Sequence, residues 1–75
     1  MAIPRGESMT QKISTIVGIS KESFADAAKK GVAAASKTVR GLKWARVTGF
    51  ELELDGGKVK SFRTTMDVYF DIEGR

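Results

Sequence analysis

The sequence contains neither cysteine nor histidine. Without cysteine the chain can form no disulfide, and without either residue a structural zinc site is not expected. Acid–base chemistry would have to rest on carboxylates, Lys or Tyr, and no phosphate-binding loop motif occurs. The sequence therefore predicts a protein that is not an enzyme and has no metal site.

Long hydrophobic runs are also missing, so no segment is expected to cross a membrane. The first nine residues, MAIPRGESM, hold one Arg and no apolar core of a secretory signal. We expect residues 1–10 to be a disordered tail and residues 11–75 to form a single domain. The lack of cysteine suits a reducing compartment, and we expect the cytoplasm.

The chain is also short. Its 75 residues, of which 41% are hydrophobic, can bury only a small core. Domains of this size usually gain stability from a disulfide, a metal, an oligomer or a ligand. With the first two excluded, the sequence favours oligomerisation or a bound cofactor.

Charge is unevenly spread along the chain. Residues 1–46 carry nine basic and three acidic groups, whereas residues 47–75 carry four basic and six acidic groups. A basic half is typical either of a solvated helix surface or of a phosphate-bearing partner. Residues 29–46 contain six cations and no acid but only one aromatic residue, and single-strand binders usually offer several stacking platforms. Nucleic acid is therefore not the expected partner.

The first half predicts one strand and one helix. Residues 11–17 (QKISTIV) are rich in β-branched side chains and read as a strand that ends at Gly18. Ser20 stands where a helix N-cap belongs, and the helix should cover residues 21–39, with Gly41 as the residue after its end. Its apolar stripe is mostly small, which lets a helix lie close to a sheet. The stripe consists of Phe24, Ala27, Ala28, Gly31, Ala35 and Val39.

The second half predicts a long hairpin, with strands at residues 43–54 and 59–72 joined by a turn at residues 55–58. If the turn is Gly56-Gly57, Trp44 faces Tyr69, Arg46 faces Asp67 in an ion pair, and Phe50 faces Arg63. If the turn is Asp55-Gly56, the partners shift by two, and the two faces of the hairpin stay the same. The expected fold is α+β: a β-α-β-β chain whose three-stranded antiparallel sheet, in the order 1-3-2, packs on one helix.

Alternation along the hairpin separates two faces. One is an ordinary core face, with Ala45, Val47, Gly49, Met66, Val68, Phe70 and Ile72. The other mixes aromatic and charged groups: Trp44, Arg46, Thr48, Phe50, Leu52 and Leu54, opposite Arg63, Thr65, Asp67, Tyr69 and Asp71. Such a face, which the single helix cannot cover, is typical of a subunit interface or a ligand platform. From residue chemistry alone, the indole of Trp44 is either buried between subunits or stacked on a planar ligand.

Three segments of the sequence resemble the dodecins, small flavin-binding proteins that form hollow dodecamers. The segments are VGISKESF at residues 17–24, KTVRGLKW at 37–44 and FRTTMDVYF at 62–70. The resemblance implies twelve protomers that close a shell, with Trp44 stacked on the isoalloxazine of riboflavin or FMN and with Arg46, Arg63 and Thr65 nearby. Two antiparallel flavins would lie between two such tryptophans. The implied role is flavin storage and photoprotection, and coenzyme A is a further candidate ligand.

One position departs from the dodecin pattern. Flavin-binding members usually carry Gln nineteen residues after the Trp, where this chain has Arg63. Gln can donate to a flavin carbonyl and accept from the ring N–H, whereas Arg only donates, so the ring N–H would need another acceptor such as a backbone carbonyl or Thr65. The alternative is therefore a dodecin-like shell without flavin, structural or binding another small molecule or ion, in which Arg63 pairs with Asp67.

Overall fold

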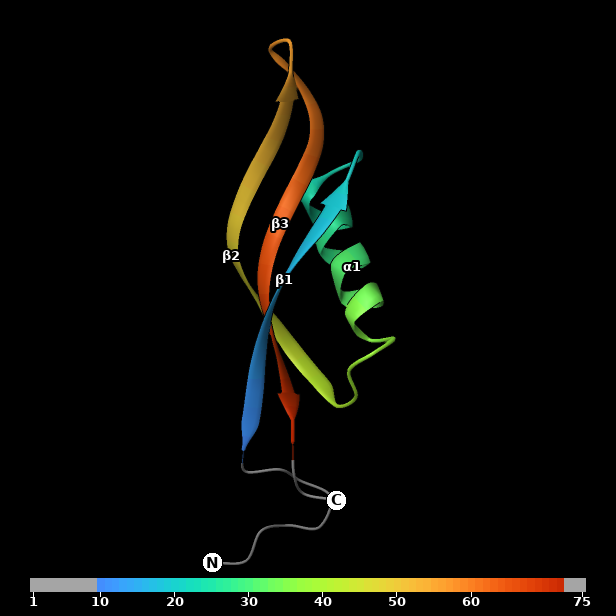
Figure 1. Ribbon diagram of the computed structural model, residues 1–75, viewed down its shortest axis with the longest axis vertical. Coiled ribbons are helices and arrows are strands. Elements are labelled where there is room, and N and C mark those ends of the chain that lie inside the picture. Colours follow the sequence, from blue (N-terminus) through green and yellow to red (C-terminus); the bar gives the residue numbers. More distant parts are fainter. Residues whose placement is uncertain (1–9, 73–75) are drawn as a thin grey trace, which may run out of the picture.

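The computed structural model describes residues 10–72 of the chain. Its elements are β1 (Gln11–Ser20), α1 (Phe24–Ala35), β2 (Leu42–Asp55) and β3 (Lys58–Asp71). The strands form one antiparallel sheet in the order β1-β3-β2, with α1 on one side (Figure 1). This confirms the predicted α+β fold and strand order. The expected tail lies, apart from Thr10, outside the described residues.

The helix lies against β1 and β3 and makes little contact with β2. Gly18 of β1 and Gly31 of α1 allow this close packing, since a Cβ built on Gly18 would lie 1.9 Å from the carbonyl oxygen of Ala27. The fully enclosed hydrophobic core of the described residues is small and consists of Ala27, Met66 and Val68. The hairpin of β2 and β3 extends past the helix along the long axis (Figure 1).

The strand–helix junction differs from the prediction. β1 continues through Gly18, which pairs with Thr64, and ends at Ser20. The N-cap is Ser23 rather than Ser20, and its hydroxyl accepts a hydrogen bond from the Asp26 amide at 3.0 Å. Two serines three residues apart both suit a cap. Pairing with β3 keeps Ser20 in the sheet and leaves Ser23 to begin the helix.

The helix also ends earlier than predicted, at Ala35, with Ser36 as its C-cap. Gly41 is therefore not the residue after the helix end. It has a φ of +79°, and its carbonyl accepts a hydrogen bond from the Asp71 amide, so it directs the chain into β2 beside the end of β3. The positive φ explains why glycine stands there.

Asp26 fastens the first turn of the helix to the end of β1. Its carboxylate accepts a hydrogen bond from the Ser20 hydroxyl at 2.5 Å and lies 3.2 Å from the Lys30 ammonium. The Ser20 hydrogen bond first, and Lys30 second, hold the pKa of this carboxyl below its ordinary value. The contribution of Asp26 to stability is thus present at neutral pH and is lost as the pH falls through that lowered pKa.

The turn of the hairpin is Gly56-Gly57, the first of the two expected alternatives, and both glycines have positive φ, as a type I′ turn requires. Near the start of β2 the predicted register is also confirmed, with Trp44 opposite Tyr69 and Arg46 opposite Asp67.

Beyond Val47 the predicted register is wrong, because a β-bulge adds one residue to β2. Val47 pairs with Met66, but Gly49 pairs with Thr65, so Thr48 is the extra residue. Its hydroxyl donates to the Thr65 carbonyl oxygen at 3.3 Å. From Gly49 to Glu53, where a second register shift follows, the side chains of β2 lie on the face opposite to the predicted one.

The bulge places Phe50 and Leu52 on the helix side of the sheet. Phe50 pairs with Thr64, and its ring lies 4.9 Å from the ring of Phe24, centroid to centroid. Glu51, not Phe50, therefore faces Arg63. Gly49, predicted to belong to the core face, lies on the other face with Thr65.

Candidate functional site

We call the sheet face turned away from α1 the outer face. The strand pairing arranges it as four rows across the sheet: Ile13, Tyr69 and Trp44; Thr15, Asp67 and Arg46; Val17, Thr65 and Gly49; Ile19, Arg63 and Glu51. All four predicted site residues, Trp44, Arg46, Thr65 and Arg63, lie on this face. The four residues therefore lie on the same side of the sheet, as predicted. Which of them are neighbours depends on the row in which each one lies.

Trp44 is the most prominent aromatic group of the outer face. Its side chain is 58% exposed, and its ring lies 5.2 Å from the ring of Tyr69 with a tilt of 31°. A register shift between Leu42 and Trp44 brings the indole to this face. An indole supported on one side by a second ring is an ordered platform on which a planar ligand can stack.

Arg46 is the nearest cation in sequence on the same face. The predicted ion pair between Arg46 and Asp67 is wrong, since no ion pair joins them within residues 10–72. The Asp67 carboxylate instead accepts a hydrogen bond of 2.7 Å from the Thr15 hydroxyl. The exposed Arg46 guanidinium is therefore available to a ligand next to the indole.

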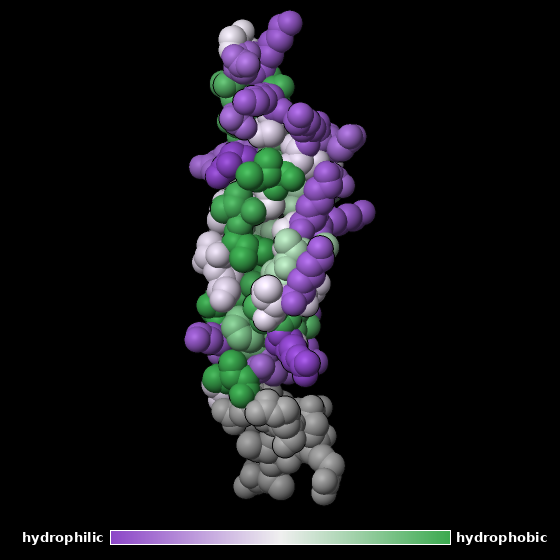
Figure 2. All heavy atoms as spheres, turned by 45° about the vertical axis from the view of Figure 1, so that its right-hand side comes forward, coloured by the Kyte–Doolittle hydropathy of each residue, from purple (hydrophilic) through white to green (hydrophobic). Residues whose placement is uncertain are grey.

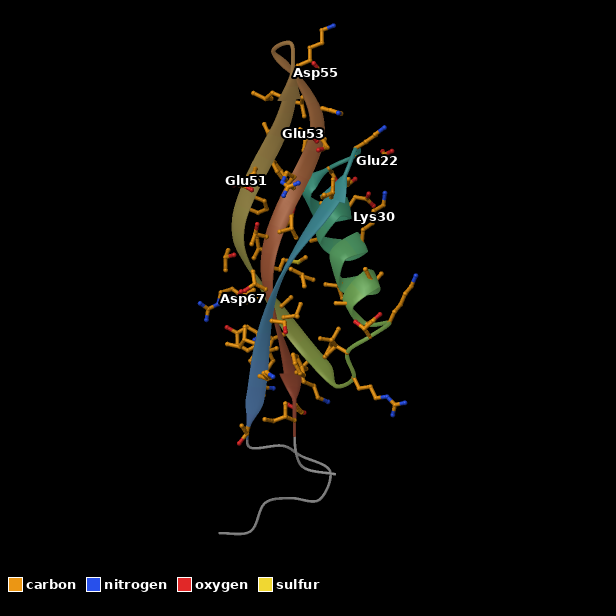
Figure 3. The ribbon with its side chains drawn as sticks, in the orientation of Figure 1. Glu22, Lys30, Glu51, Glu53, Asp55 and Asp67 are labelled. Carbon is orange, nitrogen blue, oxygen red and sulfur yellow. The ribbon has the colours of Figure 1, made fainter. Side chains whose placement is uncertain are left out.

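Arg63 lies far from Trp44 within one protomer. It is six residues from Tyr69 along β3, which corresponds to about 20 Å at a strand rise of about 3.3 Å per residue. Its guanidinium lies 3.9 Å from the carboxylate of Glu51. Figure 3 shows Glu51 and Asp67 at clearly different levels of the long axis. One protomer thus brings Trp44, Tyr69 and Arg46 together, whereas Arg63 belongs to the other end of the face.

Two residues of this face were missing from the predicted site. Tyr69 supports the indole. It could have been included in the predicted site, because the predicted register already set it opposite Trp44. Glu51 pairs with Arg63 only because of the bulge at Thr48, which strict alternation cannot show.

A second uncovered surface lies on the helix side of β2. Because α1 packs on β1 and β3, an open apolar groove of about 460 Å³ remains between the helix and β2. Figure 2 shows a column of hydrophobic side chains along the long axis, bordered by hydrophilic ones. Phe50 and Leu52 continue the groove toward the hairpin tip and are 60% and 45% exposed. The groove is lined by Ala28, Lys29, Val32, Ala33, Ala45, Val47 and Met66.

The cations of residues 29–46 do not form one track. Lys30 pairs with Asp26 beside α1, Lys43 pairs with Asp71, and Arg46 lies on the outer face. Within residues 10–72 no helix is long and apolar enough to span a membrane. The same residues contain no group of three or more His, Cys, Asp or Glu that could hold a metal ion.

Comparison with known proteins adds independent findings. The family model described as Dodecin matches residues 10–73. No curated protein sequence matches the chain. Among solved structures, the dodecin of Streptomyces davaonensis is 31% identical, with a TM-score of 0.81 over 85% of this chain and 94% of that one. The dodecin of Streptomyces coelicolor is 27% identical, with a TM-score of 0.82 over 88% and 94%.

A calcium-chelating antigen of Mycobacterium tuberculosis, named calcium dodecin, is also similar. It is 26% identical, with a TM-score of 0.76 over 85% of this chain and 91% of that one. The family model covers nearly the whole chain, and the β-α-β-β topology agrees with it. The chain therefore belongs to the dodecin family, whose members are binding proteins and not enzymes.

Proposed function

We propose that this protein binds a flavin, riboflavin or FMN, by stacking the isoalloxazine on Trp44, and that it stores and shields the flavin in a cytoplasmic homododecamer. The observation that carries the proposal is the 58% exposed indole, supported by Tyr69 on a sheet face that the helix does not cover. An electron-rich indole next to the isoalloxazine is suited to quench the excited state of the flavin. Coenzyme A stays a second predicted ligand.

The hydrogen-bonding groups next to the indole fit such a ring in part. Arg46 can donate to carbonyl oxygens of the isoalloxazine, whereas the hydroxyl of Thr65, the predicted acceptor for the ring N–H, lies about 13 Å from Tyr69 along β3 and is not beside the indole. Arg63 stands at the position of the usual Gln, but within one protomer it lies about 20 Å along β3 from the row of Trp44 and Tyr69. A ring on Trp44 would therefore meet Arg63 only from another protomer.

Titration of riboflavin with the purified protein tests the proposal. We expect flavin fluorescence to be quenched and to saturate at one flavin per protomer, because each protomer supplies one indole platform. N-acetyl-tryptophanamide at the same concentration is the control for collisional quenching. Unchanged flavin fluorescence at micromolar protein would contradict flavin binding.

Oligomerisation is supported by the amount of apolar surface that one protomer exposes. Among the described residues three hydrophobic side chains are buried, whereas eleven large ones are exposed by 37% or more. Soluble monomers seldom leave such contiguous patches uncovered. A second copy seated on the groove and on Phe50 would bury those of the helix side.

Phe50→Asp is expected to break the assembly, because it places a charge on the groove side of β2. By light scattering the wild-type protein should have about twelve times the 8.1 kDa protomer mass, and the variant a much smaller mass. Ala25→Asp adds the same charge on the exposed first turn of α1, outside the groove, and should leave the mass unchanged. A monomeric wild-type protein, or a Phe50→Asp variant of unchanged mass, would reject this interface.

A shell that does not bind flavin is the second candidate. It is favoured by the pairing of Arg63 with Glu51 and by the calcium dodecin among the relatives. Since residues 10–72 of one protomer offer no cluster of metal ligands, an ion would need ligands from several protomers. This candidate predicts a dodecamer that leaves riboflavin fluorescence unchanged and binds calcium in a direct titration.

A further inference from the structure

A ring stacked on Trp44 needs an acceptor for its N–H. The imide edge of an isoalloxazine alternates a carbonyl oxygen, an N–H and a second carbonyl oxygen, so a matching protein edge must offer donors and an acceptor side by side. Thr65, the predicted acceptor, lies about 13 Å from Tyr69 along β3, and the side chain of Arg63 has only donors. The acceptor must therefore come from a row closer to the indole.

Arg46 and Asp67 form the row beside Trp44 and Tyr69. They are cross-strand partners on the outer face, each two residues along its strand from the aromatic row, which corresponds to about 7 Å. Directly opposite residues of an antiparallel pair have Cβ atoms about 5 Å apart. No ion pair joins the two side chains within residues 10–72, so this row presents a guanidinium and a carboxylate next to each other without neutralising either.

The carboxylate of Asp67 is oriented but not saturated. Its Oδ1 accepts the 2.7 Å hydrogen bond from the Thr15 hydroxyl, which holds the side chain in place. Its Oδ2 has neither a hydrogen bond nor an ion pair in the part of the chain that the structure describes. A carboxylate offers about four lone-pair sites, so the bond to Thr15 leaves it able to accept from a ligand. The residue is only half-buried, and a ligand can therefore reach it.

Asp71 is the other carboxylate that flanks Tyr69 along β3 on this face. Its Oδ1 accepts a hydrogen bond of 2.8 Å from the side-chain amide of Gln11, and its Oδ2 lies 3.8 Å from the Lys43 ammonium. Both oxygens of Asp71 thus have partners within the protomer. Of the two carboxylates beside the aromatic pair, Asp67 is the one with an oxygen left for a ligand.

We propose that Asp67 accepts the hydrogen bond of the flavin's imide N–H while Arg46 donates to a neighbouring carbonyl oxygen. This role rests on the proposed flavin binding at Trp44 and makes Asp67 a specificity residue for rings that carry an unsubstituted imide. Together the two side chains supply the donor and the acceptor that one Gln amide would supply. The bond to a carboxylate is charge-assisted, which makes it stronger than a bond to a neutral amide oxygen.

Riboflavin and 3-methylriboflavin, in which a methyl group replaces the imide hydrogen, test this contact. Their dissociation constants are measured by fluorescence quenching in the wild type and in Asp67→Ala. We expect the wild type to bind riboflavin about three- to tenfold more tightly than the methylated ring, the range of one exposed hydrogen bond. In Asp67→Ala the affinity for riboflavin should fall to that for 3-methylriboflavin. A rise of the 3-methylriboflavin affinity to that of riboflavin would instead show a clash of the methyl group with Asp67 and refute the hydrogen bond.

Three further variants sharpen the comparison. Asp67→Asn keeps the size and an acceptor oxygen but loses the charge, so an intermediate preference for riboflavin is expected. Asp71→Asn is the matched control and should keep the full preference, because both oxygens of Asp71 already have partners. Arg46→Ala should weaken both ligands alike, since both retain the carbonyl oxygens to which Arg46 donates.

Equal affinity of the wild type for the two ligands, or a preference for riboflavin that persists in Asp67→Ala, would overturn the role of Asp67 while leaving flavin binding intact. Absence of riboflavin binding to the wild type would instead overturn the proposed function, and this inference with it.

Discussion

Replacing Trp44 with alanine is expected to weaken riboflavin binding by about ten- to hundredfold, because the variant loses the stacking platform. The indole is 58% exposed, and its ring contact among the described residues is with Tyr69, so its removal should hardly change the stability of the protomer. Loss of quenching with an unchanged thermal midpoint would thus show that the variant has lost ligand binding and not its fold. The measurement is the quenching titration described above.

Two further variants separate stacking from general loss of aromatic surface. Trp44→Phe keeps a smaller ring and should retain part of the affinity. Tyr69→Phe keeps the ring beneath the indole and removes only the hydroxyl, so it should bind as the wild type does. A Trp44→Ala variant that binds riboflavin with wild-type affinity would refute the stacking site.

Gly18→Ala is expected to cost more than about 3 kcal/mol of stability, a large share of the total for a domain of this size. The added Cβ would lie 1.9 Å from the Ala27 carbonyl oxygen, and backbone on both sides leaves no flexible group that could move away. The helix would have to lift off β1, which also loosens the contact with Met66. The expected result is a much lower midpoint of urea unfolding by circular dichroism, or no folded protein.

Gly49→Ala is the control for this substitution. Gly49 also lies within a strand, its φ is not positive, and its added Cβ would meet nothing within 4 Å. The free energy of unfolding of this variant should therefore stay within about 0.5 kcal/mol of the wild-type value, as is usual for surface substitutions. Equal effects of the two substitutions would show that the close approach of α1 to Gly18 does not limit stability.

The topology could be predicted because each element has a clear local signal. β-branched residues indicate β1, the stripe of small residues indicates a helix that lies close to a sheet, and Gly56-Gly57 indicates the hairpin turn. The ends of the elements were less accurate. Ser20 and Ser23 are both suitable caps, and only the pairing of β1 with β3 decides between them.

The face assignment failed where the period of the strand is interrupted. Alternation from Trp44 predicted Arg46 correctly, but the bulge at Thr48 reversed the sides of Phe50 and Leu52. Gly49 inside a strand is the one sequence signal for such a bulge. The site was overestimated for another reason: Arg63 shares the face of Trp44, but its row lies six positions along β3 from that of Tyr69, and sharing a face does not bring two rows together.

The small core has a consequence for how stability should be described. Ala27, Met66 and Val68 are the buried hydrophobic side chains of the described residues, so an isolated protomer has little to hold it folded. Whatever covers the groove and the outer face binds the folded state and not the unfolded chain, and it therefore stabilises folding by mass action. The thermal midpoint then depends on protein and ligand concentration, and folding and association become one coupled equilibrium rather than two successive events.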